Sequence, residues 1–333
     1  GGMLTQWASW RWVLFVNVPI GVAVIALSRL VLAETPRRSG RFDVTGALTS
    51  TIGMVALVYG FVHAASNGWG NTATIASFAV GVVLLVAFVL TELRASSPIT
   101  PLRLFADRNR STSYLARLLL VAGMMGMFFF LTQFLQGVLG YSPLKTGFAF
   151  LPLTAMLFAA STLSARILVE RVGSRALIAG GITLSTGGLL WLTQLSETSN
   201  YLSLLGPLLI FGLGNGISFV PLTTTALDGV APEDAGAASG LVNVMQQLGG
   251  SLGLSVLVTV FATASTNAAR HVRPGESAAQ LARHAFMIGA DRAFLVATMF
   301  LAATVLLTGF AIRPSAPRST DAQASDDAVP VEA

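Results

Sequence analysis

The sequence predicts an all-α membrane protein, a polytopic helix bundle with about nine transmembrane helices, on three observations. Nine apolar stretches each approach the roughly 20 residues that a helix needs to cross a hydrocarbon core. The chain of 333 residues is 53% hydrophobic and only 11% charged, which is incompatible with the surface of a soluble domain. Lys and Arg gather in alternate loops, as in multi-pass membrane proteins. Because backbone polar groups cannot cross lipid unpaired, such stretches indicate helices.

The apolar stretches are separated by segments that are polar, turn-forming or broken by proline. Residues 66–71 form a turn-rich junction between the second and third stretches, and Pro98 and Pro101 interrupt residues 97–105. The predicted spans are residues 12–33, 44–64, 75–93, 113–137, 146–168, 176–194, 203–225, 237–264 and 291–312.

The Pro-interrupted segment 97–112 is expected to lie at the membrane surface. Its apolar side chains Leu102, Leu104 and Phe105 would rest on lipid. Its arginines would face lipid phosphates; they are Arg103, Arg108 and Arg110. Arg117, one turn inside the next span, is expected to extend its guanidinium to the cytoplasm, with a substrate or proton role as the less favoured interpretation.

The distribution of basic residues predicts the orientation of the chain. Of the 20 Lys and Arg residues, 14 fall on one side, in or beside loops 34–43, 94–112 and 169–175 and in the tail. The other six fall on the opposite side, mostly in or next to a longer loop predicted at 265–290. We therefore place the basic loops, loop 226–236 and the C-terminus in the cytoplasm. The N-terminus is then outside without a basic signal segment, so we expect further helices upstream.

Composition also argues against several classes of site. The chain has no cysteine and three scattered histidines, His63, His271 and His284, so a metal site is not expected, and neither is another cofactor. The basic balance does not indicate nucleic-acid binding, because the arginines are spread over short loops rather than on one face. No His/Asp/Glu or Ser/Lys constellation indicates an enzyme.

Residues 9–21 carry the first family resemblance. Their sequence resembles the signature of drug:proton antiporters in the major facilitator superfamily, where it follows the glycine-rich fifth helix. Two tryptophans suit the headgroup belt, while a proline and a glycine would bend the helix or permit close packing. The matching residues are Trp10, Arg11, Trp12, Asn17, Pro19 and Gly21.

Residues 133–147, continuing to Leu151 and Pro152, are similar to the first helix and loop of the second six-helix half in that group. Gln133 and Gln136 are three residues apart and share a helix face. Amides in a membrane helix normally face the bundle interior. Lining of a substrate cavity and interhelical hydrogen bonding are equally favoured interpretations.

Residues 164–175 are similar to the superfamily's cytoplasmic loop. Arg171, Gly173 and Arg175 stand as expected, whereas Glu170 replaces the usual aspartate and the leading glycine is absent. The resemblance implies that this loop helps to lock a cytoplasmic gate. We expect Arg171 or Arg175 to pair with an acidic residue of loop 228–234, either Glu233 or Asp234; anchoring by the positive-inside rule is the alternative.

Residues 236–253 look like the penultimate helix of the fourteen-helix exporters. The pairs Gly236/Gly240 and Gly249/Gly253 permit close helix packing. Asn243 and Gln247 are four residues apart, share a face, and are expected to line the cavity. Asn215, in the glycine-rich segment 212–216, is a further lining candidate, although local backbone bonding is equally favoured. The Met- and Phe-rich residues 124–130 could offer an adaptable surface to large drugs or face lipid.

These resemblances imply the domain organisation of a fourteen-helix antiporter whose first five helices are absent. Residues 1–33 would hold the last helix of the N-terminal half, and 34–112 a two-helix insert with a cytoplasmic linker. Residues 113–312 would form the six-helix C-terminal half, and 313–333 a disordered cytoplasmic tail.

The function implied by the resemblance is proton-coupled efflux of drugs or antibiotics across the cytoplasmic membrane by alternating access. The expected partners are apolar or cationic small molecules, protons and the lipid bilayer, with the protein acting as a monomer. No Asp or Glu lies at mid-depth in the predicted spans, and the family's coupling carboxylate would lie upstream of Gly1. A dedicated metabolite exporter, an uptake symporter on the same fold, and a non-transporting scaffold or receptor remain alternatives.

Overall fold

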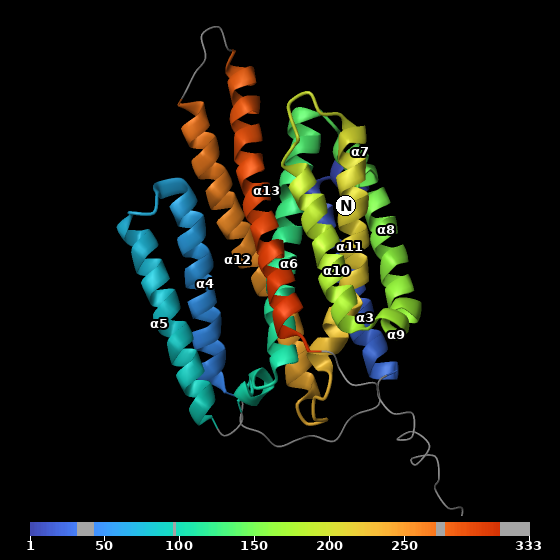
Figure 1. Ribbon diagram of the computed structural model, residues 1–333. Coiled ribbons are helices and arrows are strands. Elements are labelled where there is room, and N and C mark those ends of the chain that lie inside the picture. Colours follow the sequence, from blue (N-terminus) through green and yellow to red (C-terminus); the bar gives the residue numbers. More distant parts are fainter. Residues whose placement is uncertain (32–42, 96–97, 271–276, 314–333) are drawn as a thin grey trace, which may run out of the picture.

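The computed structural model describes residues 1–31, 43–95, 98–270 and 277–313, and within these ranges every regular element is helical (Figure 1). Nine helices there are long and apolar enough to cross a membrane, and each overlaps one predicted span. Most of the predicted loop 34–43 and the tail beyond Arg313 lie outside the described residues. The helical fold class is therefore confirmed.

The helices follow one another with short connections. They are α1 (Gly2–Trp7), α2 (Trp10–Phe15), α3 (Asn17–Val31), α4 (Val44–Asn67), α5 (Thr72–Arg94), η1 (Leu102–Phe105), α6 (Arg108–Gln133), η2 (Phe134–Val138), α7 (Pro143–Ala149), α8 (Leu151–Leu163), η3 (Ser164–Leu168), α9 (Val169–Val172), α10 (Ser174–Leu192), α11 (Tyr201–Leu227), α12 (Ala235–Ala269) and α13 (Ala278–Ala311). Side-chain caps begin several of them: Asp43, Asn71, Asp107, Asn200 and Ser277 each accept a backbone N–H of the first turn.

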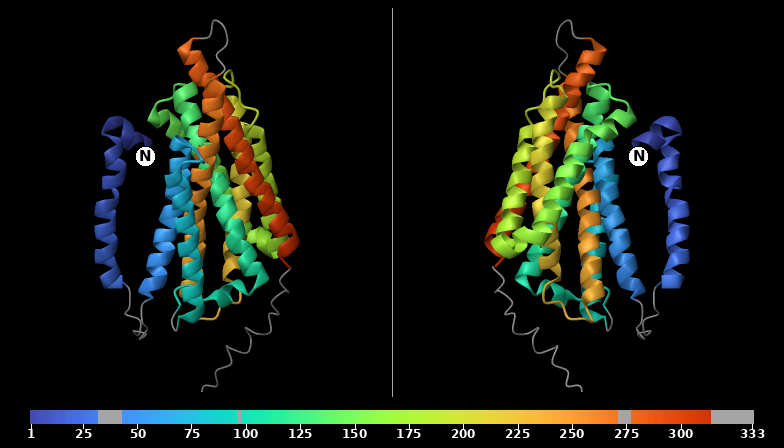
Figure 2. Two further views of the ribbon diagram at one scale, coloured as in Figure 1. Left: turned by 90° about the vertical axis from the view of Figure 1, so that its left-hand side faces the viewer. Right: turned by 90° about the vertical axis from the view of Figure 1, so that its right-hand side faces the viewer.

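The first span is interrupted between α2 and α3. Pro19 has no N–H to donate to the carbonyl four residues earlier, and α2 ends at that residue, Phe15. In both views of Figure 2 α3 runs along one edge of the molecule, and none of the most apolar part of this span is buried. Within the described residues, the N-terminal stretch contacts α7 through α1, where Gln6 accepts the backbone N–H of Leu144 and Gly2 lies against the Pro143 carbonyl.

Helices α4 and α5 form a hairpin whose contact is made at glycines. A Cβ at Gly53 or Gly81 would meet the leucines of the opposing helix, and one at Gly60 would meet the Phe78 ring. Small residues let the two backbones approach closely where lipid gives helices little hydrophobic reason to associate. The hairpin lies beside α12, and Thr259 of α12 donates a 3.0 Å hydrogen bond to the Phe61 carbonyl of α4.

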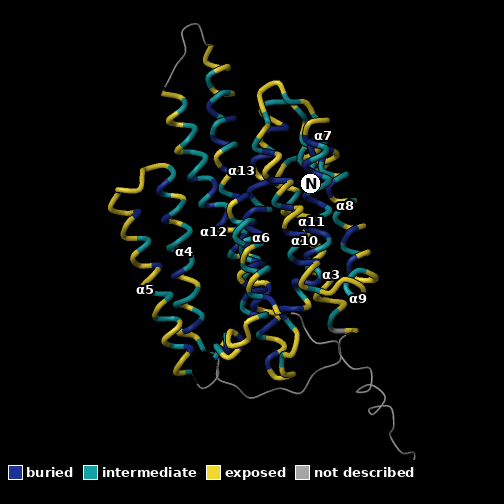
Figure 3. Tube along the Cα trace, in the orientation of Figure 1, coloured by how far each residue is buried: buried dark blue, intermediate teal, exposed yellow. Residues whose placement is uncertain are grey.

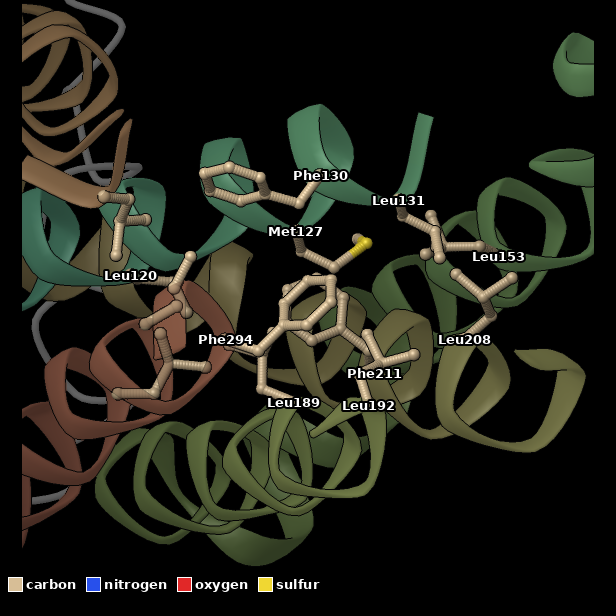
Figure 4. Packing of buried hydrophobic residues seen from close by; sticks show 14 of the residues in the cluster. Leu120, Met127, Phe130, Leu131, Leu153, Leu189, Leu192, Leu208, Phe211 and Phe294 are labelled. Carbon is tan, nitrogen blue, oxygen red and sulfur yellow. The ribbon is translucent and has the colours of Figure 1, made fainter. Parts of the chain in front are cut away.

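The remaining six spans surround a core contributed by α6, α8, α10, α11 and α13 (Figure 4). Met127 and Phe130 of α6 are fully buried there, next to Phe211 and Phe294. The Met- and Phe-rich residues 124–130 therefore belong partly to the core. Neither expected environment, a drug-binding surface or lipid, accounts for Met127 and Phe130. Figure 3 shows burial concentrated in α6, α10 and α11 and exposure on α3, α4 and α5.

Glycines of α11 allow it to pack closely against helices on two of its sides. A Cβ on Gly212 or Gly216 would press on backbone carbonyls of α8, and one on Gly214 would collide with the carbonyl of Gly181 in α10. The glycine-rich segment 212–216 therefore serves close packing.

The exported loop predicted at 265–290 is mostly helical, which corrects that prediction. Helix α12 continues to Ala269 and α13 starts at Ala278, so both project beyond the hairpin in Figure 1. Ser277 and Gln280 form a reciprocal capping box at the start of α13. The hydropathy pattern did not predict these helical turns because polar side chains make them less apolar than a membrane span. Their alanines nevertheless favour a helix.

The linker before α6 is also placed differently from the prediction. Leu104 is 1% exposed and Arg110 is 8% exposed, so these side chains pack inside the bundle rather than on the lipid surface. Arg110 donates to the carbonyl of Asp228 and Arg108 to that of Phe310. Protein carbonyls thus take the place expected for lipid phosphates at these two arginines.

The two glycine pairs of α12 have different environments. A Cβ on Gly249 would collide with the Leu118 backbone, and one on Gly253 with Ala122, both in α6. A Cβ on Gly236 or Gly240 would meet no neighbouring atom within 4 Å. The prediction of close packing therefore holds for the second pair, and the first has no such contact within the described chain.

Gly249→Ala is predicted to lower the stability of the protein. The added methyl must displace the Leu118 backbone, and overpacking of this kind costs about 1–3 kcal/mol. Gly240→Ala, on the same helix in open space, should be neutral or stabilising by up to about 1 kcal/mol. Thermal unfolding in detergent measures both, and equal melting temperatures for the two variants would contradict the packing described.

Candidate functional site

The amides of Gln133 and Gln136 lie at the end of α6. Gln133 is its last residue and Gln136 lies in the π-helical turn η2 that follows. Both side chains are exposed, and neither makes a hydrogen bond to another described residue. Such π turns occur often at functional sites. The structure gives no support to interhelical bonding of these two amides within the described residues.

The amides of α12 lie at a different depth. Asn243 is eight residues from the start of the helix at Ala235, about 12 Å along its axis. Asn243 and Gln247 are both exposed, and the Asn243 amide donates only to the Ser239 carbonyl of its own helix, at 3.2 Å. Exposed amides thus occur near both ends of the bundle.

Asn215 is enclosed between α10 and α11. It is fully buried, and its amide donates to the Ser185 hydroxyl and the Phe211 carbonyl, both at 3.1 Å. Its side-chain oxygen has no partner among the described residues. The structure therefore favours packing and local bonding for Asn215, the second of the two interpretations given for it.

The basic loop is built by α9 and the turn into α10. Gly173 adopts φ +83°, a left-handed conformation that favours glycine. Glu170, Arg171 and Arg175 are exposed. Arg175 donates to the Gly309 carbonyl near the end of α13, which places this loop against the last helix.

Of the two acidic partners expected for that loop, Asp234 pairs elsewhere, and Glu233 forms no ion pair with a described residue. Asp234, which directly precedes α12, accepts two 2.8 Å hydrogen bonds from the Arg103 guanidinium of η1. This pairing corrects the expectation that Arg171 or Arg175 binds Asp234. The Arg103 side chain is 65% exposed and that of Asp234 10%, and a fork-shaped guanidinium binds both carboxylate oxygens at once.

The ion pair changes the titration of both groups. The hydrogen bonds from Arg103 hold the pKa of Asp234 below its usual value, and Asp234 raises the pKa of Arg103. Because the aspartate pKa is lowered, the stabilising contribution is complete above the unfolded value of about 3.9 and is lost as pH falls through the folded value. The pair is therefore intact at neutral pH.

Arg117 is buried, which corrects the expectation that it reaches the cytoplasm. The residue is 4% exposed, donates to the Thr223 hydroxyl at 2.7 Å, and stacks its guanidinium 3.7 Å from the centre of the Phe219 ring. Both partners lie in α11. The aromatic face attracts the cation, so the arginine is held between α6 and α11.

Sequence reasoning did not identify Arg103 as a partner of Asp234. The two residues are 131 positions apart, and no local pattern connects them. Glu92 is a second residue whose role the sequence does not show: it is 4% exposed and accepts the backbone N–H of Thr100 at 3.0 Å. It thus ties the linker to the hairpin, and only tertiary structure shows it.

Comparison with known proteins adds the family context. The chain is similar to the puromycin resistance protein of Streptomyces alboniger, 40% identical over 319 residues, 92% of this chain and 60% of that protein. It is 38% identical to the cephamycin export protein of Amycolatopsis lactamdurans over 325 residues, 96% of this chain and 64% of that one. A multidrug resistance protein of Mycobacterium tuberculosis is 34% identical over 263 residues, 79% and 49% of the two chains.

The chain spans about half to two thirds of the length of these relatives. Residues 1–254 also match the family profile of the Major Facilitator Superfamily. With nine membrane-length helices among its described residues, a two-helix hairpin between the first of these spans and the last six, and this match over most of its length, the chain belongs to the Major Facilitator Superfamily of membrane transporters.

Proposed function

We propose that the protein exports antibiotics or other drugs across the cytoplasmic membrane, driven by the proton gradient and working by alternating access. The observation that supports this most strongly is similarity over more than nine tenths of the chain to proteins named for puromycin resistance and cephamycin export. In this proposal residues 113–312 are the C-terminal half of the transporter, residues 34–112 the central insert, and residues 1–33 the last helix of the other half.

The substrate path in this proposal passes the four exposed amides. Gln133 and Gln136 would contribute near the outer end, and Asn243 and Gln247 nearer the cytoplasmic end. A mostly apolar wall with a few amides suits large apolar or cationic drugs, because the amides fix orientation while apolar contact supplies affinity. Asn215, enclosed between α10 and α11, would support the packing of these helices in this proposal.

The cytoplasmic closure in this proposal involves two neighbouring contacts. Arg103 and Asp234 join the linker to α12, and Arg175 joins the basic loop to α13. Glu170, Arg171, Gly173 and Glu233 would shape the same surface. The arginine count supports a cytoplasmic position for this surface and for the C-terminus. A monomer with protons as the coupling ion is the working unit that we propose.

A dedicated exporter for one compound is the second candidate. One relative is named for a single antibiotic family and another for multidrug resistance, so the fold serves both purposes. Substrate breadth separates the two candidates.

Ethidium and puromycin efflux is predicted in cells that express the full-length protein and lack their own exporters. Export should exceed that of vector controls and fall to the control level when a protonophore collapses the gradient. Fluorescence for ethidium and scintillation counting for labelled puromycin provide the measurement. Efflux that persists without the gradient contradicts proton coupling, and export of puromycin alone favours the dedicated exporter.

Gln136→Leu and Asn243→Leu are predicted to change the substrate profile without changing membrane abundance. Loss of one amide contact worth about 1 kcal/mol corresponds to about a fivefold change in apparent affinity for substrates that use it. Gln194→Leu, an exposed amide in the connection between α10 and α11, serves as the matched control. Identical substrate profiles for all three variants would show that Gln136 and Asn243 do not line the substrate path.

Arg103→Asp is predicted to reduce transport severalfold, because two carboxylates then face each other where an ion pair stood. The exchange Arg103→Asp with Asp234→Arg restores opposite charges and should recover at least half of the lost activity. Arg94→Asp, an exposed arginine at the end of α5, is the control for charge alone. Failure of the double variant to recover, with normal abundance, would show that the pair has no role in transport.

A further inference from the structure

A pocket of about 620 Å³ lies where the outer turn of the α4–α5 hairpin meets α12 and α13. It is separate from the four amides and from the Arg103–Asp234 contact. Most of its wall is apolar, including Val260 of α12 and Leu295 and Val296 of α13. Trp69 of the hairpin turn closes one side, and Arg292 supplies a single positive charge.

Arg292 has no counterion in the part of the chain that the structure describes. The ion pairs found there are Arg103 with Asp234 and, if the histidine is protonated, His284 with Glu197. Arg292 is exposed and donates no hydrogen bond to a described residue. A free guanidinium beside apolar walls favours an anionic group, because its planar fork binds phosphate or carboxylate through two parallel hydrogen bonds.

The pocket lies at the outer membrane interface in the orientation proposed above. Helices α4 and α5 have 24 and 23 residues, about 35 Å each, so their connecting turn must emerge at the interface. Trp69 in that turn is 52% exposed, as tryptophans of the interfacial belt are.

The polarity of the pocket changes along the membrane normal. Helix α12 runs outward and α13 runs inward, so Asn267 and Arg292 lie nearer the outside than Val260 and Val296. The seven residues from Val260 to Asn267 span about 10 Å. The pocket is thus polar at the interface and apolar toward the hydrocarbon.

We propose that this pocket binds an anionic phospholipid of the outer leaflet, with its phosphate on Arg292 and an acyl chain along Val260, Leu295 and Val296. The lipid joins the hairpin to α12 and α13 above their contact through Thr259 and Phe61. Free phosphate would leave the apolar wall unused, and a neutral or cationic drug would leave Arg292 unpaired. The inference concerns a site outside the substrate path and does not depend on the proposed substrates.

The test measures lipid retention by the purified full-length protein with native mass spectrometry. The probes are phosphatidylglycerol, which is anionic, and phosphatidylcholine, which has no net charge. The wild type should retain one phosphatidylglycerol in preference to phosphatidylcholine. Arg292→Gln should lower phosphatidylglycerol retention about tenfold, the value of one charge-assisted hydrogen bond, while Arg283→Gln, on the same exposed helix end outside the pocket, should retain it.

A second variant tests the apolar wall. Ala264→Trp fills the pocket and should lower retention of both lipids, with thermal unfolding confirming that the variant folds. The melting temperature should rise on adding phosphatidylglycerol for the wild type and Arg283→Gln but not for Arg292→Gln. The proposal would be overturned if Arg292→Gln retained phosphatidylglycerol as well as the wild type does, or if the wild type retained both lipids equally. Displacement of the lipid by inorganic phosphate at about 10 mM would overturn it too.

Discussion

The arrangement of this bundle depends on close approach of helix backbones at glycine. Lipid satisfies no backbone group and gives helices little hydrophobic reason to associate, so packing between small residues holds them together. Helix α11 presents Gly212 and Gly216 to α8 and Gly214 to α10, and α12 presents Gly249 and Gly253 to α6. Because these contacts fix which faces of the helices meet, they also decide which polar side chains of the described residues are enclosed and which are exposed.

The chemistry of the unit follows from that packing. Asn215 and Asn243 are the same residue type on neighbouring spans, but the contact of α11 with α10 encloses the first, whereas the second lies on an uncovered face of α12. Polar contacts then gather at the helix ends: Arg103 with Asp234, Arg110 with the Asp228 carbonyl, and Asn109 with the backbone of Arg313. They connect the linker and the chain's last helix to the bundle.

The sequence was sufficient for features that depend on composition along one helix. Apolar length predicted each of the nine spans found in the described residues. The residues around Pro19 predicted a bend or close packing, and the helix is interrupted between Phe15 and Asn17. Features that need two helices were missed. Arg117 was expected at the surface because snorkelling is the usual solution, but Phe219 and Thr223 of α11 accommodate it inside. Hydropathy also placed the start of α13 too late, at residue 291 instead of Ala278, since its first turns are helical without being strongly apolar. The roles of the amides as cavity lining and of the basic loop as a gate stay predictions.

The central claim is that the exposed surfaces bearing Gln136 and Asn243 border an aqueous substrate path rather than lipid. Residues 1–333 contain no cysteine, so single cysteines can be introduced once any cysteines elsewhere in the full-length protein are replaced. Labelling of Gln136→Cys and Asn243→Cys with a charged thiol reagent, with and without substrate, tests the claim directly. The account predicts that both react and that substrate protects them, while Leu306→Cys, on an exposed apolar position of α13, stays unlabelled. Reactivity at Gln136 and Asn243 no greater than at Leu306 would contradict it, because these surfaces would then lie against lipid.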